Sequence, residues 1–293
     1  MNNGIVIGIG EILWDMLPDG KKLGGAPANF AYHVAQFGLD SCVVSAIGQD
    51  ESGAEIEKSL AAKGLKRQLE SVPYPTGTVE VAVDAAGIPQ YQIKENVAWD
   101  HIPYTSSLEA LARSAKAVCF GSLAQRSSVS RASIQRFLKA VPSENEPLLI
   151  FDINLRQHFY EPPTLIHSLE LCNILKINDE ELAAISQMFG CPEQEQQAQC
   201  KWFLRKFGLR MLILTCGTAG SSVFTAESVS TQATPRVKVA DTVGAGDSFT
   251  AAFVASLLKG KSIAEAHRTA VAVSAYVCTQ YGAMPQLPPQ YLR

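Results

Sequence analysis

A glycine-rich stretch late in the chain carries the residues best suited to chemistry: Asp241-Thr-Val-Gly-Ala-Gly-Asp247. Two glycines so close together let the backbone turn tightly and approach a ligand that a Cβ would exclude. The apolar residues of 248–258 recur at helical spacing, so the stretch is expected to open a helix. The helix dipole and the first backbone amides would then point at a bound anion, and those amides belong to Gly244, Ala245 and Gly246.

Asp247 stands beside this predicted anion site, where a carboxylate is electrostatically unfavourable. It could take a proton from a hydroxyl while the amides stabilise a phosphoryl group in transfer. An acid in the first turn also stabilises a helix, and helix stabilisation alone explains Asp247 about as well. The complete string favours catalysis, because DTVGAGDSF resembles the second signature of the pfkB family, the ribokinase-like carbohydrate kinases. The resemblance implies that Asp247 is the catalytic base and that residues 244–246 form an anion hole.

A second glycine-rich stretch, Gly24-Gly-Ala-Pro-Ala-Asn29, precedes a predicted helix that ends at Gly38. Pro27 suits the first turn of a helix. Taken alone, an ordinary loop leading into a helix is the better explanation. However, GGAPANFAYHVAQFG resembles the first signature of the same family. That resemblance implies that this stretch, Gly24 included, binds the sugar, with hydroxyls held at Gly25 and Asn29.

Asp15 is the third candidate for sugar binding. It follows a predicted buried strand over Gly4–Gly10 that continues through Ile12–Trp14, and a turn is expected at Pro18–Gly20. Open α/β sheets place ligand-binding groups at strand ends, although an aspartate also commonly leads a turn. The Gly-x-Gly pair in the strand does not indicate a dinucleotide site, because a leucine occupies the third glycine position and no helix follows.

From residue 117 onward, predicted strands alternate regularly with predicted helices, the last helix covering 264–278. This order predicts an α/β fold with a mostly parallel central sheet and helices on both faces. A further short strand is expected over Arg236–Ala240, where apolar residues alternate. Polar or glycine residues follow each main strand, and carboxyl strand ends share one edge, so one common cleft is expected. The main strands are 117–120, 148–151, 174–177 and 211–214.

Two of these strand ends carry patterned polar groups. Asp152-x-Asn154-x-Arg156 sends three polar side chains to one side of an extended segment, and arginine suits a phosphate, although a surface ion pair is an equal alternative. Asn178 and Glu181 lie three apart at a helix start, where the glutamate also suits the first turn. DINLR resembles the segment that fructokinase-type members use near the nucleotide phosphates. Asn178-x-x-Glu181 matches the family motif tied to Mg²⁺ and phosphate through water.

The remaining nucleotide and cation residues come from the resemblance alone. TCGTAG resembles the nucleotide loop of the family, which implies that Thr215, Gly217 and Gly220 lie near the phosphates and ribose. The family also holds a monovalent cation, K⁺, with residues that correspond to Asp241 and the loop through Gly282. The Gly-Lys-Ser at 260–262 is not a phosphate loop, because it ends a predicted helix and residue 255 is alanine.

Short strands are predicted between the first βα units and the regular part of the chain. Thr78–Asp84 alternates, a turn is expected over Asp84–Pro89, and Gln90–Ile93 begins a return strand. The resemblance implies antiparallel lid strands over the sugar, roughly within 11–24 and 72–100, and a homodimer contact through them. An ordinary edge hairpin remains an equal alternative.

Composition excludes several classes of protein. The 293 residues suit a single domain over 1–293, and the net charge of −3 does not favour nucleic-acid or membrane partners. Seven scattered cysteines without a Cys-x-x-Cys pair argue against a disulfide framework or a zinc site. The first residues carry no basic leader, and no apolar run is long enough to span a membrane. A cytoplasmic protein is therefore expected.

Within the family, four segments look like bacterial fructokinases: GEILWDMLP, PTGTVEV, NVAWD and DINLR. The resemblance implies transfer of the γ-phosphate of ATP, with Mg²⁺, to the 6-hydroxyl of D-fructose. Two alternatives remain open. One is a family member that acts on ribose, 2-keto-3-deoxygluconate or a nucleoside. The other is a non-catalytic sugar-binding regulator, which should have lost the base or the anion hole.

Overall fold

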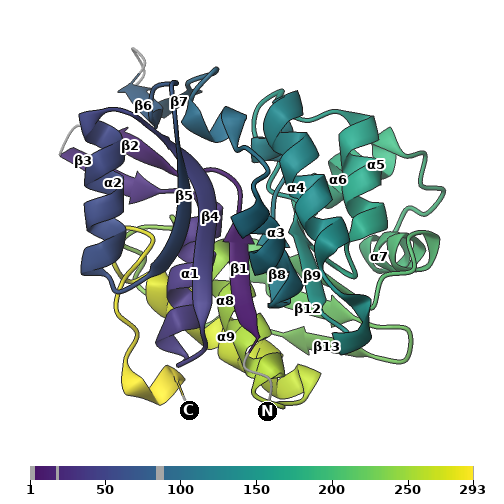
Figure 1. The fold of residues 1–293 in the computed structure, drawn as a ribbon. Helices are drawn as coiled ribbons and strands as arrows, with labels where there is room; N and C mark the ends of the chain where they lie inside the picture. Colours follow the sequence, from purple (N-terminus) through teal and green to yellow (C-terminus); the bar gives the residue numbers. More distant parts are fainter. Residues whose placement is uncertain (1–3, 18–19, 84–88, 293) are drawn as a thin grey trace.

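The computed structural model describes residues 4–17, 20–83 and 89–292 (Figure 1). Within them, nine strands form one sheet in the order β13-β12-β11-β10-β9-β8-β1-β4-β5. The pairs from β11 through β10, β9, β8, β1 and β4 to β5 are parallel, whereas β12 and β13 form an antiparallel edge. The bounds are β1 Ile5–Ile9, β4 Ser41–Gly48, β5 Lys66–Val72, β8 Ala115–Phe120, β9 Leu148–Asp152, β10 Ile174–Asn178, β11 Met211–Thr215, β12 Ser221–Phe224 and β13 Val229–Gln232.

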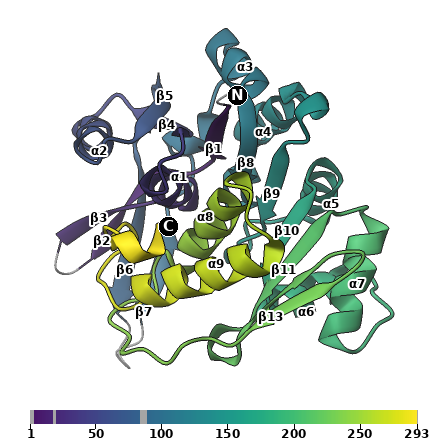
Figure 2. The same ribbon diagram turned by 90° about the horizontal axis from the view of Figure 1, so that it is seen from below.

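Helices cover both faces of this sheet (Figures 1 and 2). One face packs against α3 (Ser106–Arg113), α4 (Ser128–Ala140), α5 (Pro162–Leu171), α6 (Asp179–Met188) and α7 (Gln196–Lys206). The other packs against α1 (Ala26–Gln36), α8 (Ala245–Leu258) and α9 (Ile263–Val277), with α2 (Glu51–Ala62) beside α1. The predicted mostly parallel sheet with helices on both faces is confirmed.

Strand β1 shows why both faces are covered. Its five residues are all buried, with Ile5, Ile7 and Ile9 in one core cluster and Val6 in the other. Successive strand residues point to opposite faces, so a continuous apolar run requires a packed layer on each side. The site is built where such strands end.

A second, four-stranded sheet has the order β3-β2-β6-β7. Its strands are β2 (Leu13–Leu17), β3 (Gly20–Gly24), β6 (Gly77–Val83) and β7 (Pro89–Ile93), which confirms the short strands predicted near the N-terminus and after residue 72. The strands predicted after residue 72 are antiparallel as expected, because β6 pairs with β7 in that way, and β2 pairs antiparallel with β3. Strands β2 and β6 join the two pairs in parallel. The turns expected at Pro18–Gly20 and Asp84–Pro89 fall largely outside the described residues.

Two other predictions are corrected. Residues Ile12–Trp14 do not continue the first strand, because the chain turns at Gly10, whose φ is 149°, and enters the second sheet at Leu13. Arg236–Ala240 forms no strand, since Val237 and Val239 are 38% and 57% exposed and no strand in the described part of the chain pairs with them. Alternation predicts a strand only where one face can be buried. Strand β5 and the β12–β13 hairpin were not predicted.

None of the helices in the described ranges combines the length and apolarity that crossing a membrane requires.

Candidate active site

Helix α8 carries Asp247 as its third residue. The helix starts after Gly244, whose φ of 76° lies in the left-handed region. A Cβ on Gly244 would also come within 2.6 Å of the Ala283 side chain. Only glycine therefore fits at the start of α8, where the chain turns tightly into the helix turn that carries Asp247.

Asn29 of α1 holds Asp247. Its Nδ2 donates to Asp247 Oδ2 at 2.7 Å, a contact between residues 218 apart in the chain. Helix α1 begins after Gly25, where φ is 115° and a Cβ would lie 2.5 Å from the Glu11 carbonyl oxygen. Glycine at 25 thus lets α1 start directly against the end of β1. Asn29 Oδ1 is buried and has no hydrogen-bond partner among the described residues, so it can accept from a ligand hydroxyl.

The anion site predicted at the start of α8 has donors from two sources. The amide of Ala245 donates to Thr242 O at 3.2 Å, which leaves Gly246 and Asp247 as first-turn amides that a helix does not use itself. The Lys176 ammonium lies under the same turn, since a Cβ on Gly246 would be 2.9 Å from Nζ. Together, these donors favour a negatively charged ligand.

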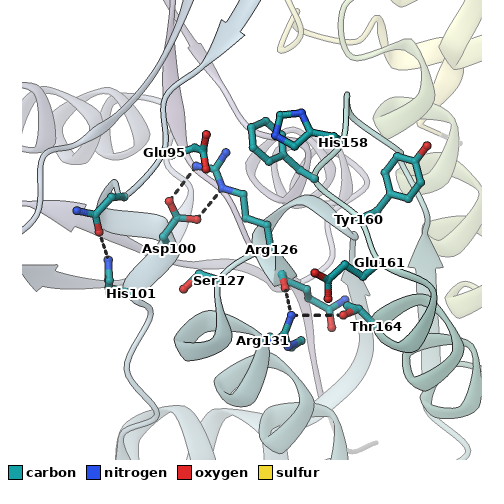
Figure 3. Close-up of a pocket in the computed structure, with 13 residues that line it drawn as sticks. Glu95, Asp100, His101, Arg126, Ser127, Arg131, His158, Tyr160, Glu161 and Thr164 are labelled. Carbon is teal, nitrogen blue, oxygen red and sulfur yellow. Dashed lines mark hydrogen bonds and ion pairs between the residues drawn. The ribbon is translucent and has the colours of Figure 1, made fainter.

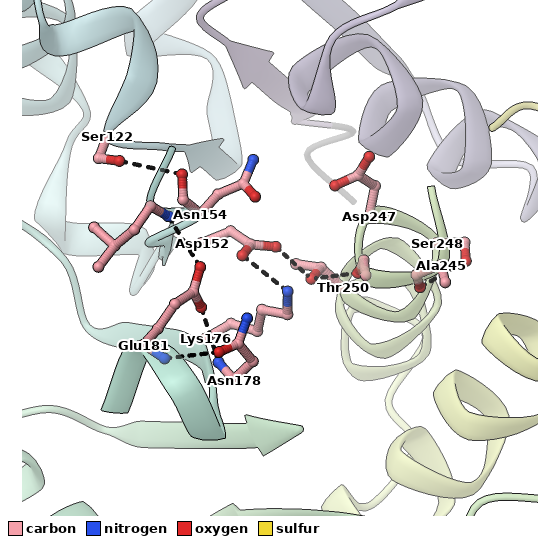
Figure 4. Close-up of polar contacts among 12 residues, drawn as sticks. Ser122, Asp152, Asn154, Lys176, Asn178, Glu181, Ala245, Asp247, Ser248 and Thr250 are labelled. Atoms are coloured by element: carbon pink, nitrogen blue, oxygen red, sulfur yellow. Dashed lines mark hydrogen bonds and ion pairs between the residues drawn. The ribbon is translucent and has the colours of Figure 1, made fainter. Parts of the chain in front are cut away.

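Lys176 belongs to a buried polar network between strands β9 and β10 and helix α8 (Figure 4). Its Nζ lies 3.0 Å from Asp152 Oδ1, and Thr250 Oγ1 donates to Asp152 Oδ2 at 3.0 Å. Burial alone would lower the pKa of Lys176, but the carboxylates of Asp152 and Glu181 outweigh it and raise that pKa. The ammonium therefore stays charged beside the predicted anion site.

Asp247 has unusual basicity for a carboxylate. Desolvation by the surrounding protein and the nearby charge of Asp152 raise its pKa to about 6, although the hydrogen bond from Asn29 and the charges of Lys176 and Arg156 oppose the shift. Asp247 is thus ionised at neutral pH and takes a proton more readily than an ordinary aspartate does. A general base works best when its pKa lies near the operating pH.

A small cavity of about 10 Å³ lies in front of Asp247, space for roughly one water molecule. It sits at the ends of β8 and β9 between α1 and α8. Its lining residues are Ala26, Pro27, Phe30, Cys119, Phe120, Gly121, Asp152, Asp247 and Thr250. A larger pocket of about 410 Å³ opens beyond the loop that follows β8, around the Asp100–Arg126 pair, and Asp247 does not line it (Figure 3).

Asp15 faces the glycine stretch predicted to bind sugar. On β2 it lies against β3, and a Cβ on Gly24 would be 2.4 Å from Asp15 Oδ2. Desolvation by burial and the charge of Asp241 raise the pKa of Asp15 to about 6. The structure therefore brings Asp241 near Asp15 and Gly24, although Asp241 comes from a distant part of the chain.

The residues predicted for the nucleotide phosphates sit on an anchored loop. Glu181 accepts the amides of Leu155 and Asn178, each at 2.9 Å, while Asn178 Oδ1 accepts the Glu181 amide at 2.8 Å. The pair is thus a capping box for α6, which also holds the 153–156 loop. On that loop Asn154 has a φ of 45°, and the exposed Arg156 contacts Leu155 O at 3.1 Å. The charge of Arg156 still reaches Asp247.

The other predicted residues lie on loops that are joined in two pairs by hydrogen bonds. Asp241 accepts the amides of Val243 and Gly282, each at 3.0 Å, and so ties the start of the 241–247 stretch to the loop after α9. Thr215 ends β11, and Gly217 O accepts from Thr234 Oγ1 at 2.6 Å. Gly220 has a φ of 112° with Gln232 O close behind it. Across the described ranges, no three His, Cys, Asp or Glu side chains gather in a metal-binding cluster.

Three residues of the site were missed by sequence reasoning: Glu11, Lys176 and Thr250. Glu11 lies two residues after the end of β1 and is only 3% exposed. A signal existed for two of them, because Lys176 interrupts an apolar strand and Glu11 is the first charge after a run of buried residues. Thr250 gave no such signal, since a threonine inside a helix is unremarkable.

Comparison with known proteins places this geometry in a family. The model of the pfkB family carbohydrate kinases matches residues 19–290. Fructokinase-2 of Solanum lycopersicum is 28% identical over 316 residues, covering 98% of this chain and 94% of its own. The ATP-dependent 6-phosphofructokinase of Thermoanaerobacterium thermosaccharolyticum is also 28% identical, over 303 residues that cover 97% and 90%. The structure of a Vibrio cholerae fructokinase with fructose, ADP and calcium superposes with a TM-score of 0.83 at 25% identity, covering 100% and 98%.

Proposed function

Because the chain belongs to the pfkB family of carbohydrate kinases, we propose that it transfers the γ-phosphate of ATP to the 6-hydroxyl of D-fructose. The observation that carries this proposal is the Asn29–Asp247 contact of 2.7 Å, which joins the predicted sugar-binding helix to the predicted base beside an anion site. The fructokinase relatives support fructose as the sugar. A regulator without catalysis is disfavoured, because the base and the glycines of the anion hole are all present.

In this mechanism Asp15, Gly25 and Asn29 hold the sugar, and the free Oδ1 of Asn29 accepts one of its hydroxyls. Asp247 takes the proton of the attacking hydroxyl as the new oxygen–phosphorus bond forms and the bond to the leaving ADP oxygen breaks. The base needs no separate activation, because its raised pKa already suits it to accept a proton near neutral pH.

The transferring phosphoryl group meets positive charge from several directions. The first-turn amides of α8 and the Lys176 ammonium lie on one side, and Arg156 on the loop after β9 supplies a further cation. Phosphoryl transfer needs positioning and charge stabilisation more than covalent chemistry, so this donor set suits it. Thr215, Gly217 and Gly220 would bind the rest of the nucleotide.

Oxygen atoms near the proposed phosphate site also suit Mg²⁺ and a monovalent cation. Glu181 would hold Mg²⁺ through water, since each of its oxygens accepts one amide and keeps a further lone pair, and Mg²⁺ prefers oxygen ligands and retains waters. When bound, Mg²⁺ supplies charge that offsets the phosphate oxygens. Carbonyl groups of the loops that Asp241 and Gly282 join would hold K⁺.

The decisive experiment offers the purified protein D-fructose, ribose, 2-keto-3-deoxygluconate and a nucleoside, each with ATP and Mg²⁺, and measures ADP release. D-Fructose is expected to give the highest kcat/KM, with fructose 6-phosphate as the product. A higher kcat/KM for any other sugar would overturn the fructose assignment, and no turnover on any would overturn the kinase assignment.

Fructose 6-phosphate belongs in the same panel as a second candidate substrate. The phosphofructokinase relative matches the chain at the same identity as the fructokinase relative. A phosphorylated sugar needs an additional cationic subsite, and Arg131 lines the larger pocket. Turnover with fructose 6-phosphate should therefore fall in Arg131→Gln. Fructose turnover should then stay unchanged.

A further inference from the structure

His33 of helix α1 is a fully buried histidine that the mechanism above does not use. Its Nε2 lies 2.8 Å from the carbonyl oxygen of Ala283, on the loop that follows α9. A carbonyl oxygen can only accept, so Nε2 carries the hydrogen. The contact joins residues 250 apart in the chain and ties α1 to that loop.

Gln36, almost one turn further along α1, fixes which ring nitrogen of His33 donates. The amide of Leu287 donates to Gln36 Oε1 at 2.7 Å, which makes the other end of that side chain the donor. Gln36 Nε2 therefore donates to His33 Nδ1 at 3.2 Å, and it lies 3.3 Å from Pro285 O. With Nδ1 accepting and Nε2 donating, the ring is neutral. Burial lowers the pKa of His33 to about 4, which agrees with a neutral ring.

The loop that His33 holds lies directly behind the start of helix α8. A Cβ on Gly244 would come within 2.6 Å of the Ala283 side chain and 2.8 Å of its carbonyl oxygen, so the two backbones are in close contact. The neighbouring Gly282 amide donates to Asp241 Oδ2 at 3.0 Å. Both ends of the turn into α8 therefore rest on this loop.

Helix α1 holds the base and this loop from one face. Asn29 and His33 are four residues apart, so they lie one above the other on the same side of the helix. Asn29 donates to the Asp247 carboxylate at 2.7 Å, while His33 holds the loop behind the turn that leads to Asp247. One helix thus fixes both the carboxylate of the base and the backbone that carries it.

We propose that His33 is a positioning residue for phosphoryl transfer: through the Ala283 carbonyl it fixes the turn into α8 and so sets Asp247 against Asn29. This inference rests on the proposed function, because His33 acts only through the base. Without that bond, Asp247 keeps its charge and its contact with Asn29, but its backbone is held less firmly. A reacting group misplaced by about 1 Å can slow catalysis by about 10²-fold, and a partial loss of order should cost less.

The first test measures kcat and the KM values for sugar and ATP in His33→Leu and His33→Gln, on the sugar that wild type phosphorylates best. Leucine fills a similar volume without a donor, so kcat should fall about tenfold while both KM values stay close to those of wild type. Glutamine presents an amide donor and should recover most of the lost rate. An unchanged kcat in His33→Leu, or no recovery in His33→Gln, would overturn the proposal.

Asn173→Leu is the matched control. The Asn173 side chain also joins two segments, donating to Pro147 O at 2.7 Å and accepting the Leu149 amide at 2.9 Å. It lies at the amino ends of β9 and β10, at the opposite edge of the sheet from Asp247. Its replacement should lower the free energy of unfolding and leave kcat unchanged. An equal fall in kcat in this control would attribute the loss to general destabilisation and overturn the proposal.

A second readout does not depend on activity. Amide hydrogen exchange of the free protein, followed by mass spectrometry, reports local opening of the backbone. Residues 241–248 and 281–288 should both exchange about tenfold faster in His33→Leu, as the loss of one buried hydrogen bond predicts, and at the wild-type rate in Asn173→Leu. Unchanged exchange at 241–248 would refute the link from His33 to α8. This measurement stays valid if wild type phosphorylates none of the sugars.

Gln36→Leu answers the same question if His33→Leu fails to fold. It removes the bonds to His33 Nδ1, Pro285 O and the Leu287 amide while it keeps the imidazole. Both segments should again exchange faster than in wild type, and kcat should fall. Wild-type exchange at 241–248 in this variant would contradict the proposal.

Discussion

Two buried aspartates of this molecule, Asp100 and Asp247, differ in the partners that surround their carboxylates. Asp100, on the 3-10 helix η1 (Ala98–His101), receives two charged hydrogen bonds of 2.8 Å from Arg126, whose guanidinium also stacks on Trp99 and Phe159. Among the described residues, Asp247 receives one side-chain hydrogen bond, a neutral one from Asn29, and its pKa is raised. The compensated acid holds η1 to the loop after β8, whereas the uncompensated one is available to react.

The two acids also differ in the size of the cavity beside them. The larger pocket, about 410 Å³, surrounds the compensated pair, and the cavity before Asp247 is about 10 Å³. Acid groups with shifted pKa values cluster at functional sites, which is why we propose the smaller cavity, before Asp247, as the place of catalysis.

The largest effect on stability is expected at the compensated pair. Asp100→Asn leaves the Arg126 charge buried without its partner, which should lower the free energy of unfolding by about 3–5 kcal/mol in urea titrations. Turnover per folded molecule should change little, because neither residue lines the cavity before Asp247. Glu109→Gln, which breaks an exposed pair with Arg113, is the control and should leave unfolding unchanged. An equally small effect for Asp100→Asn would remove the contrast.

Removing the charge of Asp247 is expected to increase the free energy of unfolding, the opposite of the effect at Asp100. Its pKa is about 6 when folded and near 3.8 when unfolded, so the folded state binds more protons between these values and loses stability as pH rises through them. Asp247→Asn removes this loss and should raise the free energy of unfolding by about 3 kcal/mol at pH 8. At pH 3.5 the difference should vanish. Destabilisation at pH 8 would show that the carboxylate serves the fold.

A smaller effect on stability is expected in the buried network of Thr250, Asp152 and Lys176. Thr250→Val removes one donor from Asp152, which keeps its contact with Lys176, and should cost about 1 kcal/mol in thermal or urea unfolding. Because Asp152 then carries more unshared charge, the pKa of Asp247 should rise, and the acid limb of the kcat/KM profile should move to higher pH. A limb that moves to lower pH would contradict the role given to Asp152.

Much of the fold could be predicted because it follows from periodicity. The strands from β8 to β11 are apolar runs bounded by polar residues, and burial on both faces gives them no other state. The two failures share a cause. Whether residues 12–14 extend β1, or 236–240 pairs at all, depends on which edge is available in space, and local alternation does not encode that.

Some residues of the candidate site could likewise be predicted from the sequence, and others could not. Asp247 and Asn29 were predicted from glycine-rich strings, because close backbone approach restricts residue type. Lys176 contacts Asp152 on the neighbouring strand and lies beside the first turn of α8, so its place in the site appears only when β9, β10 and α8 are brought together. Glu181, by contrast, was predicted as a first-turn acid from its position three residues after Asn178, and the structure shows that it also completes a capping box.

The most direct test of the central claim is single-turnover phosphoryl transfer by Asp247→Asn at pH 8, with sugar and nucleotide affinities measured by calorimetry on the same preparation. Loss of the base should slow transfer by about 10²–10⁴-fold while both affinities stay close to those of wild type. Transfer at a near-normal rate would contradict the assignment of Asp247 as the base.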